Sequence, residues 1–193
     1  MIMDINERSK EYAEGKALFA LNAAIEQAYK DGYNDGLKHL ELERLEAIKE
    51  GVEYVDLKLP SGTLWSSKYI KNDKGNKDCL PYLEASKLNL PTKEQFEELC
   101  KECFPSYVNT TKYHGIKFIG KNGESIIIEY FACDELRTLG KKDVFNFWLK
   151  DSDISNERLS ANYKIENYKV IPKFDKVYMG LKLPVMLVKR ING

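Results

Sequence analysis

Residues 55–67 read VDLKLPSGTLWSS, and this stretch marks the point where the chain changes from helical to extended patterning. In its first half apolar and polar side chains alternate, as they do in a half-buried strand. Pro60, Ser61 and Gly62 then indicate a turn, and apolar side chains resume up to Trp65. The stretch therefore predicts two short strands and a tight turn at the entrance to a globular domain.

On the N-terminal side of this stretch, residues 5–50 predict a long helix. They contain no proline and are rich in Ala, Leu, Glu and Lys, which favour helices. Gly51 offers a C-terminal stop, and Gly15 allows a reading as two helices. Residues 1–51 are thus expected to form a helical segment apart from a domain at 52–193. The apolar residues that recur at helical spacing are Leu18, Leu21, Ile25, Tyr29, Tyr33, Leu37, Leu40, Leu45 and Ile48.

The centre of this predicted helix reads YKDGYNDG and places two glycines one helical turn apart. Small residues at that spacing permit close approach of a second helix. A calcium-binding loop is the alternative, but Tyr33 occupies its third position and Leu42 its twelfth, where oxygen ligands belong. We therefore expect an oligomerisation or docking surface. Its predicted residues are Ile25, Tyr29, Gly32, Tyr33, Gly36, Leu37 and Leu40.

On the C-terminal side, the pattern predicts two short helices among many short strands, which is an α+β domain. The helices are expected at 82–88 and within LPTKEQFEELCKEC (90–103), where Thr92 and Gln95 form a capping box. Lys121-Asn122-Gly123 predicts a hairpin turn. Residues 150–166 are polar and are expected to be rich in loops. The predicted strands are 53–57, 63–65, 116–119, 125–131, 145–149, 168–171 and 183–188.

The composition argues against several classes of function. Among 193 residues, 30 are basic and 30 acidic, so bulk charge offers no support for binding nucleic acid. Residues 1–50 hold eleven acidic and seven basic side chains, a net charge of −4. No apolar run approaches the roughly 18 residues of a membrane helix, and no signal-peptide core follows the N-terminus. We therefore expect a protein made in the cytoplasm, with its four cysteines reduced.

Several of these segments together are similar to a known family. YVDLKLPSGTLWSS, LPTKEQFEELCKEC, GIKFIGKNGESIII and FNFWLKD resemble the Fibrobacter succinogenes major paralogous domain, found in Bacteroidetes and their phages. The resemblance covers residues 53 to about 189 and implies a C-type-lectin-like fold related to the formylglycine-generating enzyme. In that fold residues 55–67 would be framework, with Gly62 relieving strain in the turn and Trp65 filling the core.

The cysteines and histidines do not form a pattern typical of catalysis. Cys100 and Cys103 fall late in their predicted helix, whereas a redox CxxC pair lies at a helix N-terminus. We interpret them as packed thiols, and a zinc site with Cys79 and Cys133 is the alternative. A formylglycine-generating enzyme would need paired cysteines near its C-terminal motif, and none follows Cys133. With only two histidines, we expect no enzymatic activity and no cofactor.

These observations predict a non-enzymatic structural or recognition protein. The helix is expected to join copies of the chain or to dock onto a larger assembly. One such assembly is a phage virion, in which the protein would decorate the head or the tail. An intracellular monomeric adaptor and a zinc-stabilised binding module are the alternatives. A protein or glycan ligand is expected at the 150–166 loop, because exposed loops carry recognition. The candidate ligand-binding residues there are Asp151, Asp153, Asn156 and Asn162.

Overall fold

The computed structural model describes residues 5–71, 79–110, 114–130, 146–150, 157–166 and 169–190. The chain divides into two compact units, Met1–Glu46 and Ala47–Gly193. This division falls inside the first helix, a few residues before the boundary expected from the sequence at residue 51.

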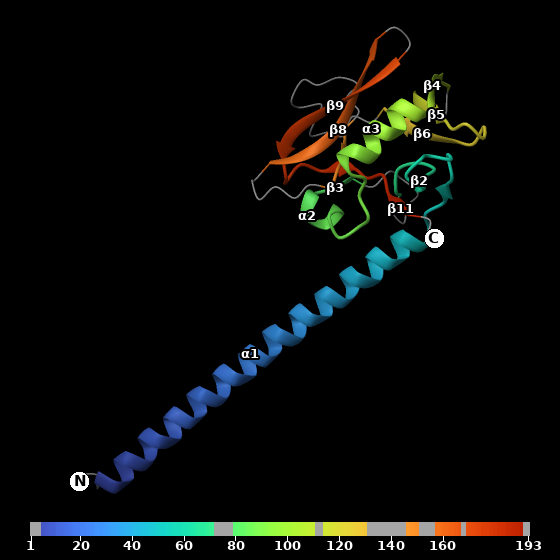
Figure 1. Ribbon diagram of the computed structural model, residues 1–193. Coiled ribbons are helices and arrows are strands. Elements are labelled where there is room, and N and C mark those ends of the chain that lie inside the picture. The colour runs from blue at the N-terminus through green and yellow to red at the C-terminus, as the bar shows by residue number, and fades with distance from the viewer. Residues whose placement is uncertain are drawn as a thin grey trace. The chain divides into compact units, whose positions relative to one another are not determined.

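Helix α1 (Ile5–Glu50) is continuous, as the proline-free and alanine-rich sequence predicts (Figure 1). Gly15 lies within the helix, so the reading as two helices is wrong. Glycine is tolerated there because it costs a helix only about 1 kcal/mol relative to alanine. The helix ends at the predicted stop, where the backbone N–H of Gly51 donates to the carbonyl of Ala47 at 3.1 Å.

The second unit is an α+β domain of antiparallel strand pairs with two short helices, as predicted. Helix α2 (Tyr82–Ala85) is shorter than expected, and α3 (Lys93–Glu102) begins at the predicted capping box. The strands are β1 (Tyr54–Val55), β2 (Thr63–Ser66), β3 (Cys79–Leu80), β4 (Phe104–Asn109), β5 (His114–Ile119), β6 (Ser125–Glu129), β7 (Phe147–Trp148), β8 (Glu157–Glu166), β9 (Lys169–Tyr178), β10 (Leu183–Pro184) and β11 (Val188–Arg190).

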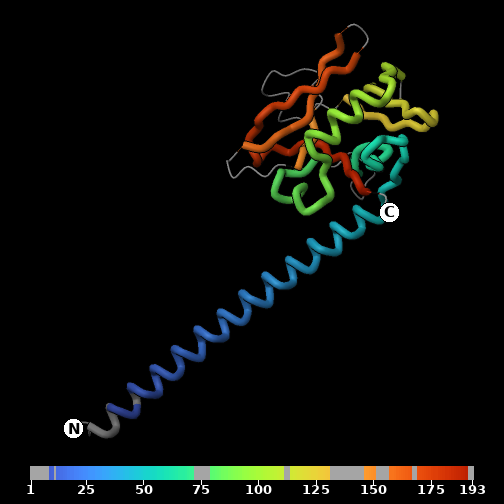
Figure 2. The backbone as a smooth tube through the Cα atoms, viewed as in Figure 1, coloured from blue at the N-terminus to red at the C-terminus, as the bar shows by residue number. Residues whose placement is uncertain are grey.

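These strands form four small sheets, and two of the sheets join segments that are distant in sequence. The strand orders are β1-β2-β11, β10-β3, β4-β5-β6 and β7-β8-β9. Trp65 on β2 pairs with Val188 on β11, which ties the start of the domain to its C-terminal end. Figure 2 shows β8 and β9 as one long hairpin in orange and red. The expectation of a loop at 150–166 is therefore wrong for residues 157–166, which form β8.

The core of this domain is aromatic and lies between α3 and the sheets. Trp65, Phe96 and Phe147 are fully buried, and the rings of Phe96 and Phe147 meet edge to face with centroids 5.2 Å apart. The sequence-based expectation that Trp65 fills the core is confirmed. Helix α3 contributes Phe96 and Leu99 to this core and packs against β9 (Figure 1). Burying each such side chain stabilises the domain by about 1.5–3 kcal/mol.

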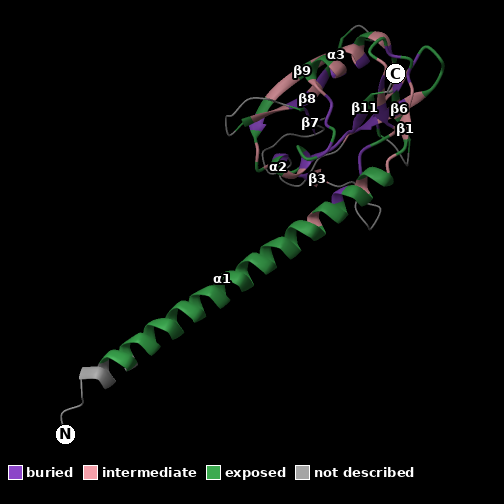
Figure 3. Cartoon of the chain, turned by 60° about the horizontal axis from the view of Figure 1, so that its bottom comes forward, coloured by how far each residue is buried: buried purple, intermediate pink, exposed green. Residues whose placement is uncertain are grey.

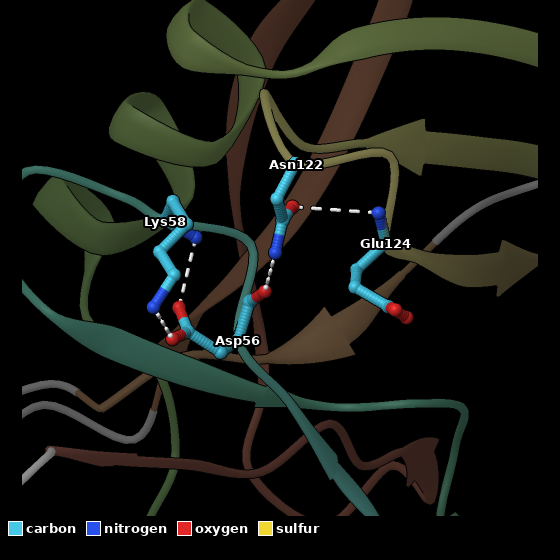
Figure 4. A network of polar contacts seen from close by, with 4 residues as sticks. All are labelled: Asp56, Lys58, Asn122 and Glu124. Atoms are coloured by element: carbon cyan, nitrogen blue, oxygen red, sulfur yellow. Dashed lines mark hydrogen bonds and ion pairs between the residues drawn. The ribbon is translucent and has the colours of Figure 1, made fainter.

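The predicted hairpin at Lys121-Asn122-Gly123 joins β5 to β6. Asn122 links this hairpin by a hydrogen bond to the connection between β1 and β2 (Figure 4). Its amide donates to the backbone carbonyl of Asp56 at 2.8 Å and accepts from the backbone N–H of Glu124 at 3.3 Å. Gly120 must be glycine, because an added Cβ would lie 2.5 Å from the carbonyl oxygen of Leu57. The turn thus holds two parts of the framework together.

Candidate functional site

The most extensive unpartnered surface that the structure describes is the apolar face of α1. All seven residues predicted as a contact surface lie on this helix. Their large side chains are exposed, from 48% at Leu37 to 76% at Tyr29 (Figure 3). A Cβ added at Gly32 or Gly36 would meet no atom within 4 Å, so neither glycine is required by packing within the chain. We call the set Leu18, Leu21, Ile25, Tyr29, Tyr33, Leu37 and Leu40 the apolar stripe.

Charged residues border the apolar stripe without entering it. Lys30 lies 2.6 Å from Glu26, and Lys38 lies 3.5 Å from Asp35, both as exposed pairs one turn apart. Such exposed pairs each contribute only about 0.3–0.5 kcal/mol to the helix. The large apolar side chains are the more informative feature, because large exposed apolar patches are uncommon on monomeric proteins.

Within the second unit, a polar groove of about 500 Å³ lies where the turn of residues 60–62 meets the start of α3. The backbone N–H and the hydroxyl of Ser61 donate to the Glu98 carboxylate at 2.8 and 2.5 Å. The Gln95 amide donates to the hydroxyl of Thr63 at 3.3 Å. These bonds join the two motifs quoted above, PSGT and LPTKEQFEEL. Because their polar groups satisfy one another, we interpret the groove as framework.

Cys100 of α3 and Cys103, which follows the last residue of this helix, are packed thiols in the structure. Cys103 is buried and Cys100 half-buried, beside a groove of about 540 Å³ between α3 and β9. Burial raises the pKa of the Cys103 thiol to about 11, and it raises the pKa of Cys100 further. A redox cysteine needs the opposite shift. Cys133 lies outside the described residues, and the described part of the chain contains no cluster of three potential metal ligands.

The predicted ligand-binding residues fall into two groups. Asp151, Asp153 and Asn156 lie outside the described residues, so their role stays a prediction. Asn162 lies on β8 and not in a loop, which corrects the sequence-based expectation. Its amide nitrogen donates to the Asp175 carboxylate at 3.2 Å, and its amide oxygen accepts from the backbone N–H of Tyr163 at 2.7 Å. Asn162 therefore belongs to the sheet framework.

Sequence reasoning missed an aromatic cluster at the edge of the β4-β5-β6 sheet. The rings of His114 and Tyr130 are 4.5 Å apart, and the hydroxyl of Tyr107 lies 2.6 Å from Nε2 of His114. Tyr107 belongs to β4, which the sequence analysis did not predict. Strand β4 contains Pro105 and Asn109, residue types that are rare in strands, so its sequence carries no local signal that would have revealed it.

Comparisons of the chain with protein-family models, with curated proteins and with solved structures found no match. None of the described helices combines the length and the apolar content that a bilayer crossing requires. Among the surfaces described above, the apolar stripe is the most extensive one that its own chain leaves exposed.

Proposed function

We propose that this protein is a non-enzymatic assembly protein. Through the apolar stripe, α1 joins copies of the chain or docks onto a larger protein assembly. Residues 52–193 are displayed as a C-type-lectin-like domain for structural decoration or for recognition of a protein or glycan. By its resemblance to domains of Bacteroidetes and their phages, we assign it to a virion, as a head or tail component.

The exposure of the apolar stripe is the observation that carries this proposal. Seven large apolar side chains, each about half exposed or more, follow one another along one helix. In water such a helix is stabilised mainly by packing of its apolar face against a partner, because a helix alone has only its own hydrogen bonds and propensities. The polar groove of the second unit is interpreted as framework and not as an active site. This interpretation supports a domain that is displayed and not catalytic.

A pair of single-lysine variants tests the proposal in the full chain. Ile25→Lys places a charge on the apolar stripe, whereas Ala20→Lys places the same charge on the face opposite Tyr29, about two and a half turns away. We expect light scattering to show an oligomer for the unaltered chain and for Ala20→Lys, and a smaller species for Ile25→Lys. Equal native masses for the two variants would contradict self-association through the stripe.

A further inference from the structure

We infer that α1 pairs with α1 of a second copy of this chain, antiparallel, about a two-fold axis at Tyr29. This inference rests on the proposed function, because it specifies the partner and the geometry of the contact through the apolar stripe. It places Leu18 of one copy against Leu40 of the other, and Tyr29 against its own equivalent. The C-terminal ends of the two α1 helices then lie at opposite ends of the paired segment.

The intervals between Tyr29 and the other residues of the apolar stripe are the same toward the N-terminus and toward the C-terminus. Its other members lie 4, 8 and 11 residues away on each side. An antiparallel pair related by a two-fold axis brings residue i to residue j and residue j to residue i. Such a pair requires this mirror symmetry of the sequence, and a foreign partner does not. The mirror-related residues are Leu18 with Leu40, Leu21 with Leu37, and Ile25 with Tyr33.

The pattern also fits the way in which two helices pack. Ile25, Tyr29, Tyr33 and Leu37 follow at four-residue intervals and form one ridge along α1. In the class of helix pair with a crossing angle of about 20°, ridges of this spacing pack against ridges of three-residue spacing on the partner, and the two helices stay in contact over several turns. Gly32 and Gly36 lie between the ridge side chains, where a Cβ has open space within the chain. In the antiparallel pair these glycines lie level with residues 26 and 22 of the second copy, so the room beside them is available to its Ile25 and Leu21 side chains.

The charges beside the ridge complement one another across the same axis. Glu26 and Lys30 share one flank of the apolar stripe, and their Nζ and Oε1 atoms are 2.6 Å apart within one copy. A two-fold axis between the levels of these residues brings Lys30 of each copy beside Glu26 of the other. The pair then has two equivalent ion pairs between the copies. In each of them the Lys30 ammonium contacts Glu26 of the other copy, in place of Glu26 of its own copy or together with it. Asp35, on the other flank, faces the alanines near residue 23 of the second copy and no acidic group.

The area is also sufficient for a pair. If each of the seven side chains exposes on the order of 100 Å², the stripe offers roughly 700 Å² per copy. Specific, stable interfaces bury about 600–1,000 Å² per partner. The helix of one further copy is therefore an adequate occupant for this face.

Disulfide cross-linking in the full chain tests the inference. We would prepare Leu18→Cys and Leu40→Cys separately, oxidise each alone and as an equimolar mixture, and treat the unaltered chain in the same way to measure linkage by the native thiols. Both substituted positions are exposed, at 60% and 63%, so the changes leave the core of the domain untouched. We expect a covalent dimer in the mixture and none above the background of the unaltered chain in either variant alone.

Other outcomes separate failure of this inference from failure of the proposed function. A dimer formed by Leu18→Cys alone means parallel helices, and it overturns the antiparallel pair while leaving assembly through α1 intact. An absence of cross-links in every sample, with a native mass of one chain by light scattering, overturns both this inference and the joining of copies in the proposed function, and leaves only docking onto a different assembly. Tyr29→Cys is a further check, because its thiols must link in an antiparallel pair centred on this residue.

Discussion

The hydrogen bonds of Gln95 predict how strongly the start of α3 is tied to the PSGT turn. Its amide oxygen accepts from the backbone N–H of Thr92 at 2.8 Å, and its amide nitrogen donates to the Thr63 hydroxyl at 3.3 Å. Thr63 is only 1% exposed. Gln95→Ala removes both bonds, and at about 1 kcal/mol for each we expect it to cost about 2 kcal/mol of unfolding free energy.

Gln95→Glu separates the two bonds. A carboxylate keeps the acceptor for the N–H of Thr92 and gains about 0.3–1 kcal/mol from the helix dipole, but it has no donor for Thr63. We therefore expect a loss of about 1 kcal/mol or less. Glu97→Gln, an exposed change on the same helix with only a 3.8 Å ion pair to Lys93, is the control and should cost less than about 0.5 kcal/mol.

Urea unfolding followed by tryptophan fluorescence measures these differences, because Trp65 and Trp148 are both fully buried in the domain. With a slope of about 2 kcal/mol per molar urea, a loss of 2 kcal/mol lowers the midpoint by about 1 M. The reasoning is refuted if Gln95→Ala unfolds within about 0.2 M of the unaltered protein. It is also refuted if Gln95→Glu is as unstable as Gln95→Ala.

Two further predictions concern the domain. Gly115→Ala should destabilise it by about 1–3 kcal/mol or more, seen as a lower Tm, because the added Cβ would lie 2.3 Å from the carbonyl oxygen of Ile128. A Tm equal to that of the unaltered protein would show that the sheet relaxes at this point. The Cys103 thiol, with its pKa raised from 9.0 to about 11, should be alkylated slowly at pH 8 and faster as the pH approaches 11. Mass spectrometry of the Cys103 peptide checks this, and labelling at pH 8 as fast as in the urea-unfolded chain would contradict it.

The features that were predicted correctly depend on neighbouring residues. The extent of α1 follows from an absence of proline up to Gly51, and the capping box follows from Thr92 and Gln95 three positions apart. The hairpin at Gly123 follows from a glycine with φ of +83°, a conformation that other residues rarely adopt. In each case the cause lies within a few residues, so one sequence is enough to reveal it.

The features that were missed depend on residues far apart in the chain. Strand β8 is polar in composition, and its buried members Ser160, Ala161 and Tyr163 are defined by pairing with β7 and β9. Strand β4 contains Pro105, which lowers its strand signal, and it is tolerated because β4 lies at a sheet edge. No local pattern indicates such pairings.

For the candidate site, helical spacing located the apolar stripe, because the period of a helix fixes which side chains share a face. The identity of the partner depends on the surface of another molecule, and the helical spacing of this chain does not describe that surface. The mirror symmetry about Tyr29 is the one feature of the sequence that bears on that surface. Helical spacing does not distinguish self-association from docking onto a different protein, because both need apolar side chains on one face. The mirror symmetry is an additional property of the sequence.

Native mass by light scattering tests the central claim most directly, using the full chain and a chain that starts at Gly51. The second compact unit begins at Ala47 and contains the aromatic core, so the shorter chain is expected to fold. The account predicts an oligomer for the full chain and a folded monomer for the shorter one. A monomer in both cases, over the concentration range in which a stable interface forms, would contradict self-association through α1.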